Sequence, residues 1–140
     1  MTDRLIGIDF GLSKVGLSIS DPLKIISIPL KVIKYKKREE LLSKLKEIAI
    51  ENDVKYFVIG YPLNMNNKKN EMTKLVDDFF EELKNLNFNV FLQDERLSSE
   101  SAKKIMHEQN IKTGKNKEHI DLIASTIILQ SFLDKGEFNG

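Results

Sequence analysis

The sequence predicts an α/β protein whose core is a mixed five-stranded sheet flanked by helices. Three strand-like segments come first, at residues 5–8, 15–20 and 24–35, with turn residues between them, which is typical of an antiparallel meander. Two further apolar runs, at residues 56–59 and 89–93, alternate with segments of helical periodicity, and this alternation favours parallel strands. The length of 140 residues suits one domain, spanning residues 1–140, with a substantial core.

The first hairpin places an acidic residue at the end of a strand. Side chains alternate along a strand, so Gly7 and Asp9 share one face, and Gly7 leaves room there for another group to approach. A carboxylate on an apolar strand is costly unless it is paired, hydrogen-bonded or bound to a cation. Asp9 is therefore a candidate functional residue, although it could simply shape the turn before Gly11.

The middle of the chain continues the sheet and adds two helices. Pro29 predicts that the segment 24–35 is an edge strand or contains a bulge. Residues 39–51 have the apolar stripe of a helix, and the short run 56–59 is expected in a central parallel strand, followed by a loop at residues 60–64 where ligands bind in open α/β sheets. Asn70 is the expected N-cap of the next helix. Its core residues at helical spacing are Met72, Leu75, Val76, Phe79, Phe80 and Leu83.

The last third of the chain predicts two more helices after the fifth strand. Ser98 or Ser99 caps a helix that runs to about residue 108, and a basic loop occupies residues 110–117. The final helix, residues 118–133, is apolar nearly all round, so we expect it to be largely buried.

Composition sets wide bounds on function. Hydrophobic residues are 41% and charged residues 31% of the chain, and the formal net charge is +1, so any contact with nucleic acid must come from a local patch. The chain has no cysteine, which excludes disulfides and thiolate metal sites and fits a reducing compartment. It has neither a signal-peptide pattern nor an apolar run long enough for a membrane span. We expect a soluble cytoplasmic protein.

A basic run follows the third strand and has two interpretations. It consists of Lys31, Lys34, Lys36, Lys37 and Arg38. A solvated edge that discourages aggregation is the commoner use of such lysines. A patch that contacts phosphates is the alternative.

Three carboxylates fall where the predicted fold could bring them together. Asp9 ends the first strand, Asp94 and Glu95 follow the fifth strand, and Asp121 opens the last helix, with the small residues Ala124 and Ser125 below it. Strand alternation sends Asp94 and Glu95 to opposite faces, so one of them points toward the others. Such a cluster repels itself unless a divalent cation or raised pKa values neutralise it. Hard oxygen ligands suit Mg²⁺ or Mn²⁺, the ions of phosphodiester cleavage.

Four motifs in order make the sequence resemble the YqgF (RuvX) family. They are Gly7-Ile8-Asp9-Phe10-Gly11, Gly60-Tyr61-Pro62-Leu63-Asn64-Met65, Asp94-Glu95-Arg96-Leu97-Ser98-Ser99 and Ile120-Asp121-Leu122-Ile123-Ala124. The resemblance covers residues 4–133. It implies an RNase H-like fold, kinship with Holliday-junction resolvases, and a metal-dependent nuclease that matures the precursor of small-subunit ribosomal RNA.

The resemblance also implies roles for individual residues. Asp9, Glu95 and Asp121 would be the catalytic acids and the ligands of Mg²⁺ or Mn²⁺. The candidates for contact with nucleic acid are Lys14, Arg96 and Lys115, with the loops at residues 64–69 and 110–117 closing over the backbone. The partner would be precursor rRNA or branched DNA, and the protein a monomer or homodimer.

Departures from the family pattern leave all three acids in place. Lys14 stands where the family usually has Arg, which is tolerable for a point-charge contact with phosphate but not for a bidentate one. Ser125 replaces a second Ala, and His119 beside Asp121 is an additional candidate for proton transfer or metal ligation, or an exposed residue of the helix start.

Three other functions use the same residues. A DNA endonuclease acting on four-way junctions would need the same acids. A non-catalytic binding module would share the fold without needing metal at Asp9. The motif Gly7-x-Asp9-x-Gly11 is also similar to the first phosphate loop of actin-like and sugar-kinase ATPases, but those need two such domains, and this chain supplies one.

Overall fold

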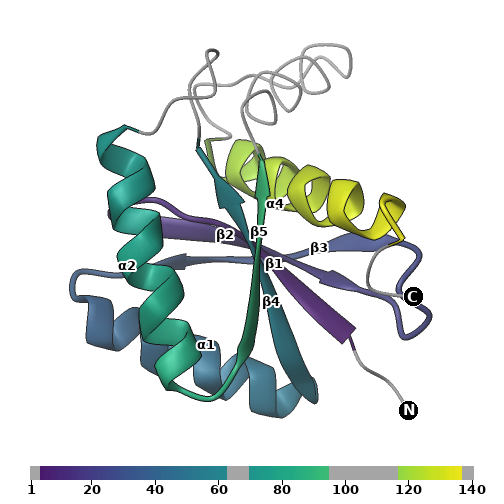
Figure 1. Cartoon of the computed structure of the whole chain (residues 1–140), viewed down its shortest axis with the longest axis horizontal. Helices are drawn as coiled ribbons and strands as arrows, with labels where there is room; N and C mark the ends of the chain where they lie inside the picture. Colours follow the sequence, from purple (N-terminus) through teal and green to yellow (C-terminus); the bar gives the residue numbers. More distant parts are fainter. Residues whose placement is uncertain (1–3, 63–69, 95–116, 137–140) are drawn as a thin grey trace.

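A five-stranded sheet with the order β3-β2-β1-β4-β5 forms the centre of the structure (Figure 1). The structure is a computed structural model, and it describes residues 4–62, 70–94 and 117–136. Its elements are β1 (Arg4–Asp9), β2 (Lys14–Ser20), β3 (Ser27–Lys34), α1 (Arg38–Glu51), β4 (Val54–Tyr61), α2 (Glu71–Asn85), β5 (Asn89–Asp94) and α4 (Lys117–Asp134).

The pairing of the strands confirms the predicted mixed sheet. β1, β2 and β3 form the antiparallel meander, whereas β4 lies parallel to both β1 and β5. The carboxyl ends of β1, β4 and β5 therefore meet at one edge of the sheet. The strand β4 extends through Gly60 and Tyr61, residues that the sequence placed in a loop.

The third strand begins later than the sequence predicts, at Ser27 rather than at residue 24. The reason is a tight turn in which the Asp21 carboxylate accepts hydrogen bonds from the backbone N–H groups of Ile25 (2.7 Å) and Ile26 (2.9 Å). This side chain holds the backbone in a turn, where Asp is favoured. β3 is the edge strand, and the register shifts where Pro29 pairs with Ser18, so both expectations from the proline are confirmed.

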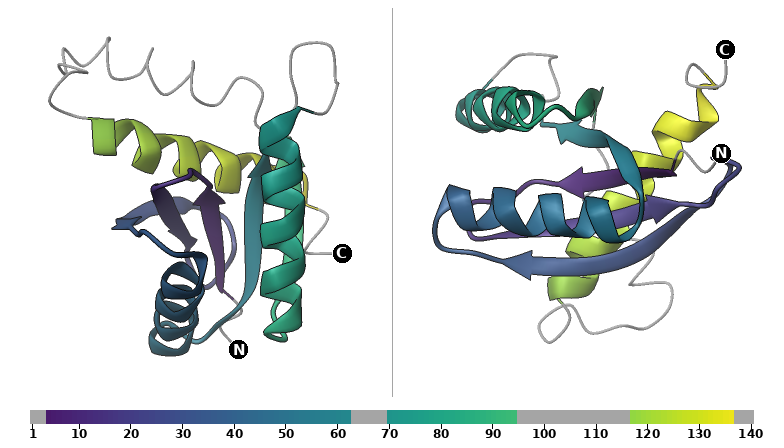
Figure 2. Two further views of the ribbon diagram at one scale, coloured as in Figure 1. Left: turned by 90° about the vertical axis from the view of Figure 1, so that its left-hand side faces the viewer. Right: turned by 90° about the horizontal axis from the view of Figure 1, so that it is seen from below.

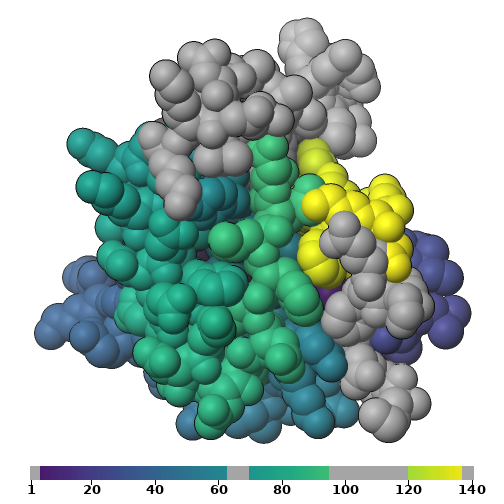
Figure 3. All heavy atoms as spheres, viewed as in Figure 1, coloured from purple at the N-terminus to yellow at the C-terminus, as the bar shows by residue number. Residues whose placement is uncertain are grey.

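Helices cover the two faces of the sheet separately, as Figure 2 shows. α1 and α2 cover one face, where they pack on residues such as Ile8 and Phe57. The helix α4 crosses the other face. The core residues of that second face are Leu5, Val58, Ile128, Leu129, Phe132 and Leu133. The space-filling view shows β5 at the surface between α2 and α4 (Figure 3), as expected for the other edge strand.

Local signals in the sequence explain where the helices lie. The Asn70 side chain accepts a hydrogen bond from the backbone N–H of Thr73, which confirms Asn70 as the N-cap of α2. In α4 the buried residues form one stripe, while Leu122, Ile123 and Ile127 are half-buried. No residue of α4 from Ile120 to Leu133 is exposed, which agrees with the expected burial of this helix, and its fully buried side chains lie on the face that packs on the sheet.

Among the described residues, no helix is long and apolar enough to cross a membrane. The predicted helix at residues 98–108 and the loops at residues 64–69 and 110–116 lie outside the part of the chain that the structure describes. Lys117, which the sequence placed in the second loop, is the first residue of α4.

Candidate active site

Asp9 is the last residue of β1 and is half-buried on the face of the sheet that α4 covers. A Cβ added at Gly7, two residues earlier, would lie 2.7 Å from the Cβ of Leu129 and 3.0 Å from the backbone oxygen of Ser125, both in α4. Residues two apart in a strand point to the same face. The side chain of Asp9 therefore belongs to the α4 face, as the sequence predicts.

Gly16 brings the start of α4 against the sheet beside Asp9. Gly16 is the direct partner of Asp9 in the β1–β2 ladder. A Cβ at Gly16 would lie 2.3 Å from the backbone oxygen and 3.0 Å from the Cβ of Asp121, so any side chain there would collide with α4. Directly opposite residues in an antiparallel pair share a face. Asp9 and Asp121 thus lie on the same face, one strand apart.

A buried hydrogen bond holds α4 at this close approach. The Ser18 hydroxyl donates to the backbone oxygen of Ser125 at 2.7 Å, and the Ser125 hydroxyl donates to the backbone oxygen of Leu122 at 2.9 Å. Ser18 and Ser125 are both fully buried. Small residues on α4 were predicted to allow a close approach, and the contacts of Ser125 agree.

The far end of α4 is fixed to the turn between β2 and β3. The Gln130 side-chain oxygen accepts from the backbone N–H of Ser27 at 2.9 Å, and its nitrogen donates to the backbone oxygen of Ile25, also at 2.9 Å. With the bond from Ser18, these contacts fix α4 to the sheet at two places. The position of Asp121 is therefore set by the whole helix.

Lys14 pairs with Asp121 across the same edge. The Lys14 Nζ lies 3.1 Å from Asp121 Oδ2, and the two side chains are 30% and 23% exposed. That oxygen is itself shielded from solvent and accepts no hydrogen bond of normal geometry from the described residues, so the contact is an ion pair only. The lysine offsets part of the charge that two nearby carboxylates would otherwise concentrate at this edge.

Comparison with known proteins identifies the family. A family model described as "RuvX: Holliday junction resolvase" matches residues 3–135. The chain belongs to the RuvX family. It is 39% identical over 134 residues to a protein of Ruminiclostridium cellulolyticum named "Putative pre-16S rRNA nuclease", covering 94% of each chain. A protein of Mycoplasmopsis synoviae with the same name is 39% identical over 133 residues, covering 94% of this chain and 97% of that one.

Solved structures support the fold of this RuvX-family chain. Thermus thermophilus RuvC in complex with a Holliday junction substrate aligns with a TM-score of 0.58 at 10% identity, covering 96% of both chains. The fowlpox virus resolvase in complex with Holliday junction DNA aligns with the same TM-score and identity, covering 94% of this chain and 97% of that one. The RNase H-like fold expected from the sequence is confirmed.

The carboxyl end of β5 lies at the same edge of the sheet as Asp9. Gly60 pairs with Gln93, and Ile59 with Ile8, so Gln93 is level with Asp9 and shares its face. Asp94 is one residue further, exposed and on the opposite face. Glu95 comes next, and it lies outside the described residues, as do Arg96, Lys115 and the side chain of His119.

The oxygen groups at this edge fit a divalent cation. Two carboxylates, those of Asp9 and Asp121, share one face, and Asp121 Oδ2 is a buried oxygen without a hydrogen bond from the described residues. Carboxylate oxygens are the ligands that Mg²⁺ and Mn²⁺ prefer. Within residues 4–62, 70–94 and 117–136 there is no group of three metal-ligating side chains, and Glu95 lies outside these residues.

Sequence reasoning missed two residues that shape the site. Gln93 is 7% exposed, and its side-chain oxygen has no hydrogen-bond partner among the described residues. Ser18 fixes α4 and was not singled out. A signal existed for both, because each is a polar residue within a run of apolar strand residues, where an unpaired polar group is costly.

Proposed function

We propose that this chain is a metal-dependent nuclease that hydrolyses phosphodiester bonds, acting in the 5′ processing of precursor 16S rRNA in the cytoplasm. The observation that carries the proposal is that Asp9 and Asp121 lie on one face one strand apart, because Gly16 of β2 lets the start of α4 come close to the sheet. The names of the curated relatives supply the substrate. A fixed pair of acids at the carboxyl edge of a sheet is what such chemistry requires.

Individual residues have different roles in the proposed reaction. Asp9 and Asp121, with Glu95, would hold Mg²⁺ or Mn²⁺, which when bound supplies an activated water and stabilises the charge on the leaving oxygen. The bond from Ser18 to α4 keeps the two acids at a constant separation. Lys14 holds the Asp121 carboxylate and presents a positive charge to the phosphate. Arg96 and Lys115 are proposed as further phosphate contacts.

The test is a cleavage assay that compares two neighbouring acids. Labelled precursor rRNA would be incubated with Mn²⁺ or Mg²⁺ and with wild type, Asp9→Asn, Asp121→Asn or Asp94→Asn. We expect the first two variants to lose at least ~100-fold in rate, because each removes a charge that positions the reaction. Asp94→Asn is the matched control, because Asp94 is exposed on the opposite face, and it should cut at nearly the wild-type rate.

A metal titration separates the enzyme from a binding module. Mn²⁺ should raise the melting temperature of wild type and do so much less for Asp9→Asn. Equal rates in wild type and Asp9→Asn, together with equal shifts on adding Mn²⁺, would refute the three-acid site. A non-catalytic nucleic-acid module would then be the better description.

The alternative substrate is a four-way DNA junction. The description of the family model names junction resolvases, and two of the solved structures with this fold contain junction DNA. The same assay with a labelled junction decides between the two. Cutting of the junction alone, by a homodimer that presents two sites, would favour the resolvase, while cutting of the RNA alone by a monomer would favour rRNA processing.

A further inference from the structure

A hollow lined with lysines lies beside the edge of the sheet that carries Asp9. Its volume is about 560 Å³, and it is bordered by the turn between β1 and β2 and by the connection from β3 to α1. The residues that line it are Ser13, Lys34, Tyr35, Lys36, Glu40 and Lys44. The set contains three lysines and one glutamate, so the residues that line the hollow have a positive formal net charge.

Hydrogen bonds to the backbone hold two of its charged side chains. The Glu40 carboxylate accepts from the backbone N–H of Lys36 at 3.1 Å, which draws it toward the start of α1. Lys44 Nζ donates to the backbone oxygen of Lys34 at 3.3 Å. That bond uses one of the three donors of the ammonium group, and the others are available to an anion.

Tyr35, which lines the hollow, is hydrogen-bonded to the turn that follows Asp9. The Tyr35 hydroxyl donates to the backbone oxygen of Gly11, and the Tyr35 backbone N–H donates to that of Ser13 at 2.9 Å. Burial raises the pKa of the Tyr35 hydroxyl, an effect that the nearby Arg38 opposes, so the group stays protonated and keeps donating. These two bonds join the hollow to the turn that follows Asp9.

Register gives the distance from the hollow to the acids. Asp9 pairs with Gly16, Gly16 pairs with Val32, and Lys34 lies two residues further along β3. Two strand spacings of about 4.8 Å and two residue rises of about 3.4 Å separate the Cα atoms of Asp9 and Lys34 by roughly 12 Å. Glu40 and Lys44 belong to α1, which covers the face opposite to the acids, so a strand of nucleic acid that lies on the acids must cross the carboxyl edge of the sheet to place a nearby phosphate in the hollow.

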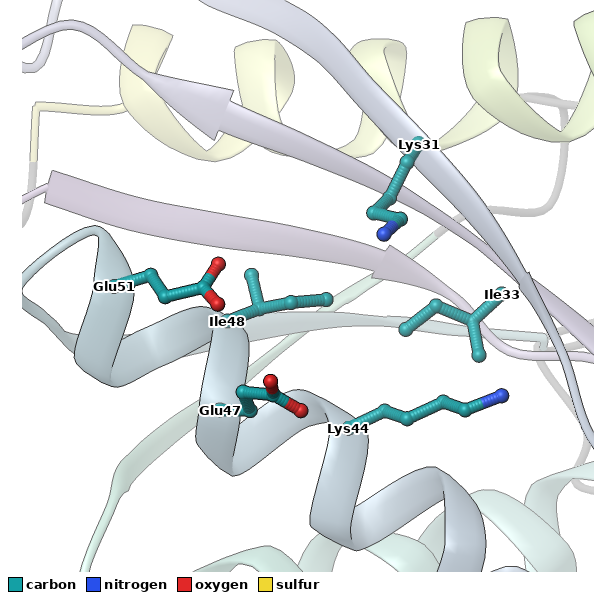
Figure 4. A pocket seen from close by; sticks show the side chains of 6 residues that line it. All are labelled: Lys31, Ile33, Lys44, Glu47, Ile48 and Glu51. Carbon is teal, nitrogen blue, oxygen red and sulfur yellow. The ribbon is translucent and has the colours of Figure 1, made fainter.

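A second hollow, which also has Lys44 in its lining, does not share the positive charge of the first. This smaller space, about 210 Å³, is lined by Lys31, Ile33, Lys44, Glu47, Ile48 and Glu51 (Figure 4). Two carboxylates balance its two ammonium groups. Figure 4 shows the Lys44 side chain extending away from Glu47 and Glu51. Charge alone therefore favours an anion in the first hollow and not in the second.

Arg38, the last residue of the basic run, has a different role. Its guanidinium carbon lies 5.2 Å from the ring centroid of Phe10 and 5.7 Å from that of Phe79, and it pairs with Glu82. This arginine covers the core between α1 and α2. The part of the basic run that lines the first hollow is thus Lys34 and Lys36, joined by Lys44 from α1.

We infer that the hollow formed by Lys34, Lys36 and Lys44 is a binding site for a backbone phosphate of the same nucleic-acid strand that reaches Asp9 and Asp121. The inference rests on the proposed function for the identity of that strand. The site recognises the phosphodiester backbone, which RNA and DNA share, and it reads no base. It would orient the strand across the carboxyl edge so that the bond to be cut lies at the acids.

The test compares two triple variants with the same change in charge. One is Lys34→Gln with Lys36→Gln and Lys44→Gln, and the control is Lys31→Gln with Lys46→Gln and Lys55→Gln, three exposed lysines outside the hollow. Binding of a labelled single-stranded RNA and of a labelled DNA junction is measured in EDTA, which prevents cleavage, over a range of salt concentrations.

The slope of affinity against salt is the decisive quantity. Each lost phosphate contact lowers the slope of log K against log salt by ~0.7 on a single strand, so the hollow variant, which loses one phosphate site, should lose about 0.7. This loss corresponds to binding that is roughly 5-fold weaker at 0.1 M salt if the two proteins bind equally at 1 M. The control should keep the wild-type slope.

Each other outcome is decisive as well. Equal slopes in the two triple variants, or no binding of either probe by wild type, would overturn the inference. If wild type binds the probes but does not cleave them with metal present, the proposed nuclease function is refuted. The phosphate site is then still tested by the salt slopes of the two triple variants. If the hollow variant does not fold, acetylation of wild type replaces it, since bound RNA should protect Lys34, Lys36 and Lys44 and leave Lys31, Lys46 and Lys55 reactive. Equal reactivity of the two sets would overturn the site.

Discussion

Replacing Gly16 by Ala tests whether the approach of α4 to the sheet positions the acids. Gly16 does not have a positive φ, so alanine is acceptable to the backbone and the cost is one of space. The added Cβ would lie 2.3 Å from the Asp121 backbone oxygen, whereas ordinary contacts begin near 3.4 Å. The start of α4 must therefore move away from β2 by roughly 1 Å, at an overpacking cost of about 1–3 kcal/mol.

The expected effect on activity is larger than the effect on stability. A displacement of roughly 1 Å at a reacting group costs about 100-fold in rate, so Gly16→Ala should remain folded and lose most of its cleavage. Single-turnover cleavage and urea unfolding measure the two effects.

Gly136→Ala is the control for loss of stability. Gly136 has φ +69° and open space around it, so alanine there costs about 1 kcal/mol of backbone strain without moving Asp121. Cleavage by Gly16→Ala at the rate of Gly136→Ala would refute the argument that this contact sets the geometry of the site.

Three further predictions concern hydrogen bonds made by single side chains. Ser18→Ala leaves the buried backbone oxygen of Ser125 without its donor, so the free energy of unfolding in urea should fall by about 1–3 kcal/mol; a change near zero would contradict the assigned bond. Tyr35→Phe should cost about 1 kcal/mol at neutral pH by thermal unfolding, through the lost bond to Gly11. Because the pKa of Tyr35 is raised above 10.0, the contribution of its hydroxyl to the free energy of unfolding is present below that pH. It is lost as the pH rises through the pKa of the folded protein, which ultraviolet titration of the phenolate measures. Backbone N–H groups lower the pKa of Asp21 below 3.8, so its stabilisation of the turn is present above that pH and lost as pH falls through the folded value; an NMR titration that gives an ordinary value would refute this reading.

The sequence predicted the parts of the site that depend on local pattern. Asp9 follows an apolar strand, and Asp121 lies at the start of an apolar helix with small residues below it, so both could be named from alternation and helical spacing. The face that they share is confirmed by the contacts of Gly7 and Gly16. Their catalytic role stays a prediction, together with that of Glu95.

Features that depend on distant partners could not be predicted. Ser18 bonds to a residue 107 positions away, and no local pattern reveals such a partner. Arg38 was grouped with the basic run, yet its position over Phe10 and Phe79 follows from the packing of α1 against α2. The late start of β3 depends on the side chain of Asp21, which competes with the strand for the backbone N–H groups of Ile25 and Ile26.

The two acids come from elements that lie far apart in the chain, β1 and α4, so they share one face only after α4 has been made. Asp9 leaves the ribosome before Asp121, and all five strands of the sheet precede α4 in the chain. Until α4 has been made, Leu5 and Val58 lack the helix that covers them. The ion pair between Lys14 and Asp121 cannot form before then either. The closing contacts span more than a hundred residues and carry the entropy cost of long loops, so they form late. A chain that has been made only as far as β5 therefore lacks one of the two acids that share this face.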